Sequence, residues 1–472
     1  MHLHWHRRDL RVADNRALAE ATSDDPALPV FVFDGEVLDH ASPPRTAALL
    51  AALDSLSESY RECGSDLVVA HGDPREELPR LAEECGADGV RWNRDYSGLA
   101  RERDRETRQA LDDAGLSVTD FQDELLHEPG SILTNAGDHY SVFTYFGKKW
   151  LDREKDAPFD APDSETVADA DALPDFATEP LPSLADLGFD APEAAVPEMG
   201  TAAARERLAG FCEDAVFRYD EDRDFPAREG TSRLSVHLKF GTVGIREVWT
   251  AIRDAEKRAE TDAEREAVES YQRQLAWREF YAHVLDARPD VTVNNYKDYD
   301  EPIEWRDDPD GLQAWKDGLT GYPIVDAGMR QLRAEAWMHN RVRMIVASFL
   351  AKDLLLDWRE GYAWFREKLA DHDTANDTGG WQWAASTGTD AQPYFRVFNP
   401  TTQGERYDPD AEYIREFIPE LRDVPPEKIH DWPDLDPAER DDLAPDYPAP
   451  IVDHGERREA AIAMFERARG GD

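Results

Sequence analysis

Two tryptophans stand two positions apart in the segment NDTGGWQWAAST, residues 376–387, behind a pair of glycines. On a helix, two positions correspond to roughly 200° of rotation, so Trp381 and Trp383 must face nearly opposite sides. An indole is costly to leave in water, so each side must offer it a partner. Either the two rings pack in the core, or each meets a planar group in a site of its own.

A stripe of aromatic, cationic and amide side chains is expected on the helix within QRQLAWREFYAHVL, residues 272–285. Gln274, Trp277, Arg278 and Tyr281 recur at i, i+3, i+4 and i+7, which places them on one face. Such a stripe can form a flat wall for a planar ligand. The alternative is a cation–π pair at a seam between domains.

Charge inside an apolar helix is a further chemical signal. The run WMHNRVRMIVASFLAKDLLL is strongly apolar but carries Arg341 and Arg343 near its start. An unpaired interior charge costs several kcal/mol, so these guanidiniums need partners. Asp371 and Asp373, which flank His372, are candidates. A metal site at this triplet would need further ligands, and no second histidine cluster accompanies it, so an Arg–Asp pair in a cofactor pocket is favoured and no metal is expected.

Hydroxyl side chains gather in REGTSRLSVHLKFGTVG, residues 228–244. Thr231, Ser232 and Ser235 stand where a helix is expected to begin, and helix N-termini bind phosphate through their free N–H groups. The segment is therefore a candidate phosphate cradle. Ordinary helix capping by the same hydroxyls is the alternative.

The elements that position these residues differ between the two parts of the chain. In the first part strand-like runs alternate with amphipathic helical stretches, which predicts a parallel α/β sheet of Rossmann-like type. No G-x-G-x-x-G follows the first strand, so the dinucleotide fingerprint is absent. The strands are expected at 2–5, 29–33, 66–70, 89–92 and 117–121, and helices at 46–63, 75–85 and 99–114.

The remainder of the chain predicts an all-α domain. Pro, Ala and Asp dominate from about 152 to 199, as in a connector, and the pattern from about 201 onward is helical. Helices are expected at 275–285, 328–356 and 362–369. The predicted organisation is an α/β domain at 1–130, an acidic connector at 131–200 and a helical domain at 201–472.

Acidic residues dominate the composition: 54 Lys+Arg face 100 Asp+Glu, for a net charge of −46. Thirteen tryptophans and 10% aromatic residues exclude a disordered chain. The spread of acid and the scarcity of lysine beside arginine fit a globular protein that works in very high salt. At 1 M salt the Debye length is about 3 Å, so a local basic patch could still bind nucleic acid.

The setting expected from the sequence is cytoplasmic. No apolar run approaches the length of a membrane span, and MHLHWHRRDL lacks the apolar core of a signal peptide. Cys63, Cys85 and Cys212 show no C-x-x-C spacing, which indicates a reduced compartment without disulfides. We expect a monomer that does not bind membranes.

Long motifs resemble the DNA photolyase/cryptochrome family, and most closely its class I cyclobutane pyrimidine dimer photolyases. They are TSRLSVHLKFG, WREFY, WMHNRVRMIVASFLAKDLLLDWREG, GGWQWAASTGTDAQPYFRVFNPTTQGERYDP and the N-terminal WHRRDLRVADNRAL. The resemblance implies an α/β antenna domain followed by a helical domain that holds FAD. The residues it implies for FAD are Tyr219, Thr231, Ser232, Arg233, Leu234, Ser235, Tyr271, Arg343, Asp371, His372 and Asp373.

The resemblance also implies separate roles for the two indoles. Trp381 would begin an electron-transfer chain that continues through Trp358 and reaches the surface at Trp305. Trp383 would face the substrate, opposite Trp277, and the two would clamp a flipped pyrimidine dimer. The residues implied for DNA contact are Arg223, Gln274, Trp277, Arg278, Tyr281, Asn340, Arg341, Met344, Trp383, Arg396 and Gln403.

Light-driven repair of cyclobutane pyrimidine dimers in damaged DNA is therefore the expected function. The (6-4) photolyases carry a histidine pair where this chain has His339 followed by Asn340. Two catalytic positions depart from the family: Gln274 replaces a frequent Glu, and Asp377 replaces a frequent Asn beside the flavin, as in plant cryptochromes. A blue-light photoreceptor with little or no repair activity is the alternative.

A second, antenna chromophore is also expected. Folate-type members of the family carry an Asn–Glu pair in the segment that here reads NRDYSGLARERD, where Leu99 and Ala100 stand instead. This favours a deazaflavin over a folate, and an empty antenna site is the remaining alternative.

Overall fold

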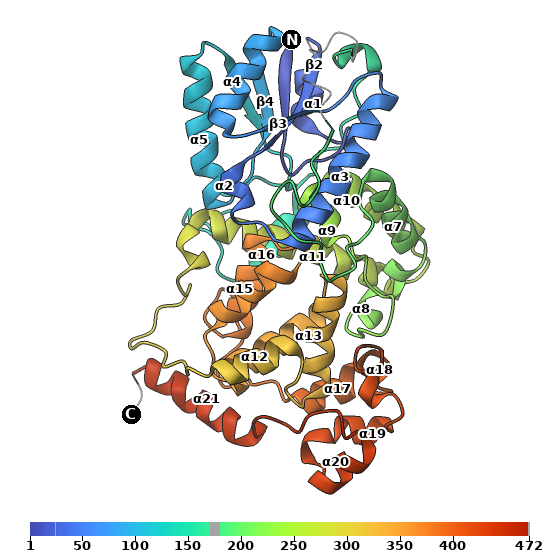
Figure 1. Ribbon diagram of the computed structural model, residues 1–472, viewed down its shortest axis with the longest axis vertical. Coiled ribbons are helices and arrows are strands. Elements are labelled where there is room, and N and C mark those ends of the chain that lie inside the picture. The colour runs from blue at the N-terminus through green and yellow to red at the C-terminus, as the bar shows by residue number, and fades with distance from the viewer. Residues whose placement is uncertain (24, 170–179, 471–472) are drawn as a thin grey trace.

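A computed structural model describes residues 1–23, 25–169 and 180–470. The N-terminal part is a five-stranded parallel sheet in the order β3-β2-β1-β4-β5 (Figure 1). The strands are β1 His2–His6, β2 Ala27–Phe33, β3 Val68–His71, β4 Gly89–Asn93 and β5 Ser117–Phe121. All five predicted strands are present, with ends shifted by no more than two residues.

Both faces of the sheet are covered, as a parallel sheet requires. Leu3, Val30 and Val68 pack with α4 on one face, whereas Phe31 and Val69 pack with α3 on the other. This alternation follows from the opposite facing of successive strand side chains. The helices of this part are α1 Arg16–Ala21, α2 Gly35–Leu38, α3 Pro43–Glu62, α4 Pro74–Cys85 and α5 Gly98–Asp113.

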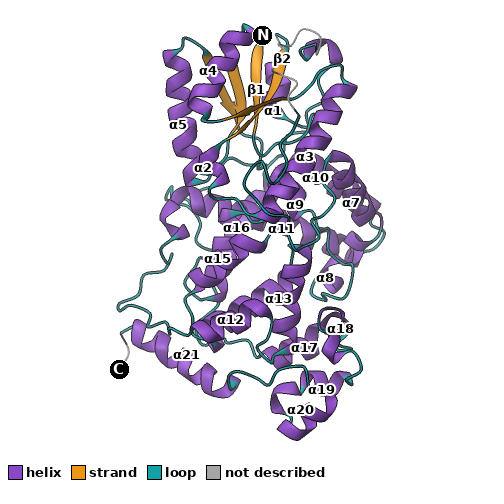
Figure 2. Cartoon of the chain, in the orientation of Figure 1, coloured by secondary structure: helices purple, strands orange, loops and turns teal. Residues whose placement is uncertain are grey.

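The rest of the chain is helical and lies below the sheet in the view of Figure 2. Its helices are α6 Phe143–Asp152, α7 Thr201–Glu213, α8 Tyr219–Asp222, α9 Ser235–Phe240, α10 Ile245–Arg258, α11 Asp262–Ala287, α12 Pro309–Asp317, α13 Pro323–Glu335, α14 Asn340–Ser348, α15 Trp358–Lys368, α16 Thr374–Ala384, α17 Pro400–Tyr407, α18 Glu412–Phe417, α19 Pro426–His430, α20 Pro437–Leu443 and α21 His454–Ala468. The α/β and all-α fold class is confirmed.

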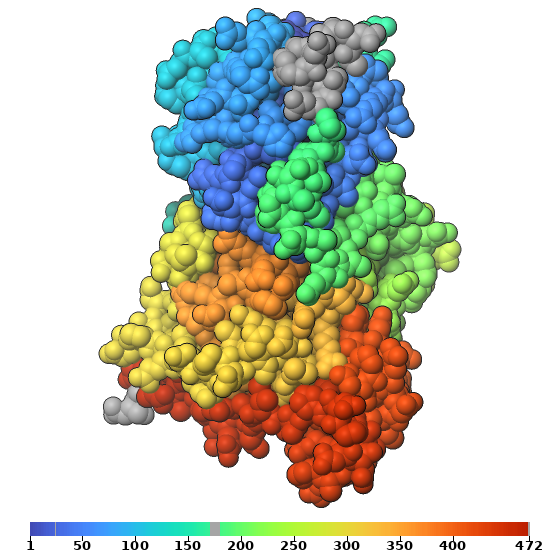
Figure 3. Space-filling view, viewed as in Figure 1, coloured from blue at the N-terminus to red at the C-terminus, as the bar shows by residue number. Residues whose placement is uncertain are grey.

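The connector is predicted at residues 131–200, and its first part, which contains helix α6, is packed into the helical core. Helix α6 buries Phe146 and Trp150 completely against α11. From residue 180 the chain crosses the seam between the two parts, seen as a green band between blue and orange in Figure 3, and Ala195 N–H donates to Ala334 O at 2.8 Å. Residues 170–179 of the predicted connector lie outside the described residues, and the domain boundaries remain a prediction.

The single helix expected at 328–356 is wrong, because the chain breaks it twice. Helix α13 ends at Glu335 because the next residue, Ala336, has a left-handed φ of 50°. Helix α14 begins after His339, whose Nδ1 accepts the N–H of Arg341 at 3.1 Å. A π-helical turn, Phe349–Asp353, then closes α14 before Leu355, which has a φ of 57°. No Gly or Pro marks either break, so the apolar pattern reads as continuous.

The π-helical turn buries a lysine. Lys352 Nζ donates to Ser386 Oγ at 2.8 Å and lies 3.9 Å from the centre of the Phe465 ring on α21. Burial, and then the neighbouring charge of Lys297, lowers the pKa of Lys352 to about 7. None of the helices in the described ranges has the length and apolarity needed to cross a bilayer.

Candidate active site

A cavity of about 280 Å³ lies within the helical part. Its walls come from α8, the segment 231–235, α11, α14 and the segment 371–377, so residues from distant parts of the chain converge on it. The lining residues that the sequence singled out are Tyr219, Arg223, Thr231, Ser232, Arg233, Leu234, Ser235, Tyr271, Gln274, Arg278, Asn340, Arg343, Asp371, Asp373 and Asp377.

The hydroxyl-rich segment 231–235 forms one wall of this cavity. Tyr271 donates its O–H to Ser232 Oγ at 2.9 Å, and Arg233 has a left-handed φ of 48°. The Tyr271 ring meets Tyr219 edge-on, with the ring centres 5.1 Å apart. Strained backbone held by buried neighbours is typical of a binding loop, and α9 begins directly after it at Ser235.

A largely buried ion pair also lines the cavity. Arg343 Nη2 donates to both carboxylate oxygens of Asp371, at 3.0 and 2.8 Å, while its Nε donates to Met338 O at 2.9 Å. Burial disfavours the charged guanidinium, but Asp371 and then Asp377 raise the pKa of Arg343 above its ordinary value. The cavity therefore holds a fixed positive charge that is not lost near neutral pH.

Asp373 ties this cavity to the α/β domain. Its Oδ1 caps α16 by accepting from Asn376 N at 3.0 Å, and its Oδ2 accepts from Arg8 Nη2 at 2.9 Å. Burial opposes ionisation of Asp373, but Arg8 and then Lys239 outweigh it and hold its pKa far below the usual range. Arg8 also lies 3.0 Å from Glu124. The loop after the first β-strand thus supplies the arginine that pairs with Asp373 behind the lining of the cavity.

His372 is turned away from this cavity, although the sequence predicts that it binds the cofactor. Its Nδ1 lies 2.5 Å from Asp377 Oδ2, and its ring is buried. Asp377 itself lines the cavity and also accepts from Asp373 N at 3.1 Å. His372 instead lines a second cavity, described below.

The two indoles of α16 face different surroundings, as their spacing predicts. Trp381 is 2% exposed and packs edge-on against Trp315 and Phe365, at 6.0 and 4.9 Å between ring centres. Its ring lies against Gly361 of α15, where no side chain would fit. Trp383 is only half-buried and has Phe398 as its neighbour, at 6.4 Å.

The other two tryptophans of the predicted electron-transfer route belong to or pack against the same hydrophobic core cluster as Trp381. Trp358 is fully buried one turn from Gly361, and its Nε1 donates to Asn295 Oδ1 at 3.0 Å. Trp305 is partly buried and meets Phe465 of α21 edge-on at 5.9 Å. Trp305 is thus more exposed than Trp358 and Trp381, which are both buried. The electron-transfer role of all three tryptophans stays a prediction.

One face of Trp277 is already occupied. Phe143 of α6 stacks on it with the ring centres 3.8 Å apart and the planes 9° from parallel. Asp390 fixes this arrangement: its Oδ2 accepts from Phe143 N at 3.3 Å, and its own N–H donates to Ser141 O at 3.1 Å. Asp390 lies in the loop after α16, so it links the chain that follows Trp383 to the helix whose Phe143 stacks on Trp277.

Of the remaining residues predicted to contact DNA, some have polar partners within the protein and others do not line the cavity. Arg341 pairs with Asp224 at 2.6 Å beside the cavity, and Arg278 donates to Glu124 O at 3.0 Å. Tyr281 packs on Gly379 instead of lining the cavity. Met344, Arg396 and Gln403 do not line it either, and Arg396 is exposed.

Several lining residues were missed from the sequence. Lys239 follows Ser235 by four positions on α9, so helical spacing alone could have found it. Asn376 lies in the quoted tryptophan segment, and Asp224 follows Arg223. Trp337 gives no signal, because it lies in the break between α13 and α14.

A second cavity of about 470 Å³ lies at the carboxyl ends of the strands, between the sheet and the helical part. Ligands of open α/β sheets bind at this edge. Leu99 and Ala100, singled out in the sequence, line it, and so does Lys239, which is shared with the first cavity.

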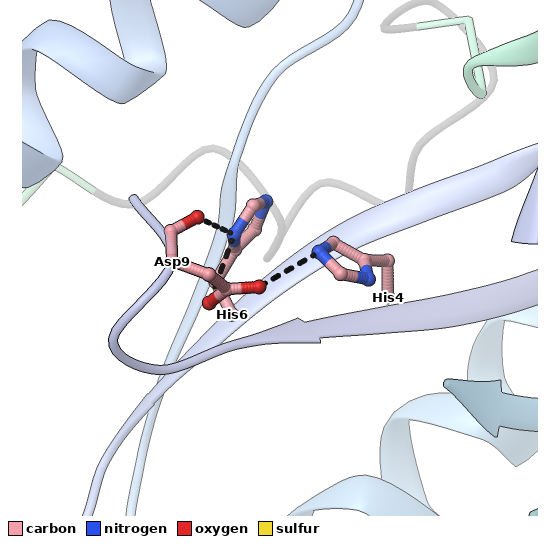
Figure 4. Close-up of side chains that lie close together, drawn as sticks. All are labelled: His4, His6 and Asp9. Carbon is pink, nitrogen blue, oxygen red and sulfur yellow. Dashed lines mark hydrogen bonds and ion pairs between the residues drawn. The ribbon is translucent and has the colours of Figure 1, made fainter. Parts of the chain in front are cut away.

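Three buried groups of β1 and the following loop, His4, His6 and Asp9, lie close enough together to suggest a metal (Figure 4). The carboxylate of Asp9 is already saturated: Asn93 Nδ2 donates to Oδ2 at 2.6 Å and Arg7 N to Oδ1 at 2.8 Å. His6 Nε2 lies 2.6 Å from Tyr60 Oη. Because protein groups occupy these atoms, the cluster is a hydrogen-bonded support beneath the second cavity.

Comparison with known proteins agrees with this geometry. Residues 2–163 match the DNA photolyase family and residues 271–467 match the FAD-binding domain of DNA photolyase. A deoxyribodipyrimidine photo-lyase of Halobacterium salinarum is 62% identical over the whole of both chains. The chain belongs to the DNA photolyase family. It is an FAD-binding DNA repair enzyme, as the matched FAD-binding domain and the photo-lyase relatives indicate.

Two solved photolyases share the fold. A class III photolyase of Agrobacterium tumefaciens is 38% identical, covers 99% of this chain and 98% of its own, and superposes with a TM-score of 0.90. A photolyase of Sulfolobus tokodaii is 31% identical, with 99% of both chains covered and a TM-score of 0.83, and it contains two FAD molecules, one described as a novel light-harvesting cofactor.

Proposed function

We propose that the protein repairs cyclobutane pyrimidine dimers in DNA with the energy of absorbed light. The observation that carries this proposal is the first cavity. It combines the Arg343–Asp371 ion pair, the hydroxyl-rich segment 231–235 and the polar side chains of Arg223, Gln274 and Asn340 in one space. Identity of 62% over the full length to a deoxyribodipyrimidine photo-lyase supports the same reaction.

The residues present fit FAD. The hydroxyls and N–H groups of 231–235 suit its two phosphates, since oriented N–H groups and hydroxyls bind anions. Arg343 suits the flavin ring of FAD, because a cation that stays charged favours the reduced, anionic form of that ring. Bound FAD would supply light-driven transfer of one electron to the dimer and would take it back afterwards, with no net oxidation, while the residues of 231–235 and Arg343 would hold it in place.

The residues of the rim bind and orient the lesion. Gln274 and Asn340 can donate amide N–H groups to pyrimidine carbonyls, and Arg223 and Arg341 neutralise neighbouring phosphates. Gln274 cannot deliver a proton, so it positions the dimer by hydrogen bonding alone. Phe143 supports one face of Trp277, the opposite face would stack on the lesion, and Trp383 would supply the other side of the clamp.

One experiment separates repair from photoreception. The purified protein, chemically reduced and held in molar salt, is irradiated with an oligonucleotide that carries one thymine dimer, and restored thymines are counted. We expect several turnovers per protein under light and none in the dark. A flavin that responds to light without restoring thymines would favour the photoreceptor alternative, for which Gln274 and Asp377 are the supporting departures.

The second cavity is proposed to hold a light-harvesting chromophore. Its position at the strand ends and its volume, larger than that of the first cavity, support a planar cofactor of flavin or deazaflavin type. Leu99 and Ala100 stand where a folate-binding pair would be needed. We also propose a cytoplasmic monomer, which the three unpaired cysteines and the scatter of the exposed large apolar side chains support.

A further inference from the structure

Basic side chains outnumber acidic ones in the lining of the second cavity, whereas acidic side chains outnumber basic ones in the chain as a whole. The chain as a whole has 54 basic and 100 acidic side chains. The cavity is lined by six basic and only two acidic ones. These are Arg7, Arg8, Arg45, Arg103, Lys239 and Arg366 against Asp34 and Asp95.

At the end nearest β1 the positive charge is largely balanced. Arg7 and Arg103 each lie 5.0 Å from the centre of the Trp5 ring. Arg7 is paired with Asp104, and Arg103 lies 3.6 Å from Asp34. This end therefore offers an aromatic and cationic surface whose positive charges are already paired with carboxylates.

At the seam with the helical part the charge is not balanced. Arg45 of α3 is 8% exposed, and its guanidinium donates only to backbone carbonyls, those of Arg366 and, at 2.8 Å, His40. Among the residues that the structure describes, no carboxylate forms an ion pair with Arg45, Arg366 or Lys239. The negative charge that favours ionised Arg45 is that of Asp377, whose Oδ2 already lies 2.5 Å from His372 Nδ1.

The environment of Arg45 confirms this imbalance. Burial, and then the adjacent Arg366 guanidinium, lowers the pKa of Arg45 to about 10. A guanidinium that is buried, crowded by a like charge and lacking a carboxylate is costly unless an anion joins it. The planar fork of arginine suits a phosphate, which accepts two parallel hydrogen bonds.

We propose that Arg45, Arg366 and Lys239 form a subsite for a phosphate group carried by the chromophore of the second cavity. The inference rests on the proposed second chromophore and narrows its chemistry. The ring would lie toward Trp5 and the strand ends, and the phosphate at the domain seam. The chromophore is then a phosphorylated flavin or deazaflavin, not one with an uncharged tail.

Riboflavin and FMN test this, because they share one ring and differ by the phosphate. Equilibrium dialysis is run with the FAD-loaded protein in constant molar salt, and bound probe is separated from FAD by chromatography. We expect FMN to bind at one site per chain, roughly tenfold or more tighter than riboflavin, as charge-assisted hydrogen bonds imply. Inorganic phosphate should weaken FMN binding but not riboflavin binding.

Arg45→Gln and Arg366→Gln should each reduce the preference for FMN severalfold and leave riboflavin binding unchanged. Arg333→Gln is the matched control, since Arg333 lies on α13 outside both cavities and pairs with Asp317 at 3.3 Å. Equal affinity for the two probes, no binding of either, or an unaltered preference in both variants would overturn the subsite. Repair of dimers by the FAD-loaded protein needs neither probe, so it tests the proposed function independently.

Discussion

The opposite facing of Trp381 and Trp383 allows the functions of the two side chains to be separated. Trp381→Phe should block light-driven reduction of oxidised FAD, because phenylalanine is much harder to oxidise and the route is cut at its buried end. Repair by protein reduced chemically beforehand should persist. Absorbance of the flavin under illumination, followed by thymine counting, checks both. Normal photoreduction in this variant would contradict the electron route.

Trp383→Ala should have the opposite effect. It removes one side of the proposed clamp, and stacking of one base is worth about 1–3 kcal/mol, so affinity for dimer-containing DNA should fall by roughly tenfold to a hundredfold. Photoreduction should stay intact. Lesion binding measured by fluorescence anisotropy, with undamaged DNA as the control, provides the measurement. Equal losses on damaged and undamaged DNA would mean that Trp383 acts only in packing.

At the scale of elements, Asp390 is expected to hold the two walls of the clamp together. Asp390→Ala should weaken lesion binding about tenfold, because Phe143 loses its anchor and Trp277 its stacked support. Asp390→Asn should restore binding, since its amide oxygen can accept the same N–H and Asn tolerates the left-handed φ of 44°. FAD content and photoreduction, measured in parallel, should not change in either variant. A loss that Asn does not rescue would point to the carboxylate charge instead.

The buried lysine of the π-helical turn predicts a pH dependence of stability. Its pKa is lowered to about 7 in the folded protein, whereas in the unfolded chain it is about 10.4. Between these values the unfolded chain binds more protons, so stability should rise with pH over this window. Lys352→Met should flatten that rise in thermal melts, each pKa unit being worth about 1.4 kcal/mol. Lys257→Met, at an exposed position on α10, should leave it unchanged.

Elements that obey one local rule could be predicted from the sequence. All five strands are predicted because each is a short strand-like run between helical stretches. The break between α13 and α14 could not be, because Ala336 adopts a left-handed backbone with no glycine to signal it. The position of this break depends on the packing of α13 against α18 and α14, and the local sequence pattern carries no information about that packing.

The same distinction applies to the site. The Arg343–Asp371 pair could be expected, because a charge in an apolar helix must be neutralised. The Arg8–Asp373 pair could not, since 365 positions separate its members and nothing local links them. The placement of His372 against Asp377, and not in the first cavity, depends likewise on the path of the chain after α15.

At the scale of the whole molecule, the acidic exterior predicts how DNA binding responds to salt. With a net charge of −46, ordinary counterion release cannot drive affinity, and the clamp with a few arginines must supply it. Affinity for a dimer-containing duplex should therefore persist from moderate to molar KCl, with a shallow log–log slope. A steep decline over this range would show that phosphate contacts dominate despite the acidic surface.

The contact of Arg8 with Asp373 has a consequence for how such a protein can change over evolutionary time. The α/β and helical parts match separate family models, yet a residue next to the first strand pairs with Asp373, which lines the first cavity. A chimera that joins this helical part to the α/β part of a distant relative would need to bring an equivalent arginine with it. Lineages that exchange one part without that residue would leave the Asp373 carboxylate without its arginine partner, so the two halves are expected to be inherited together.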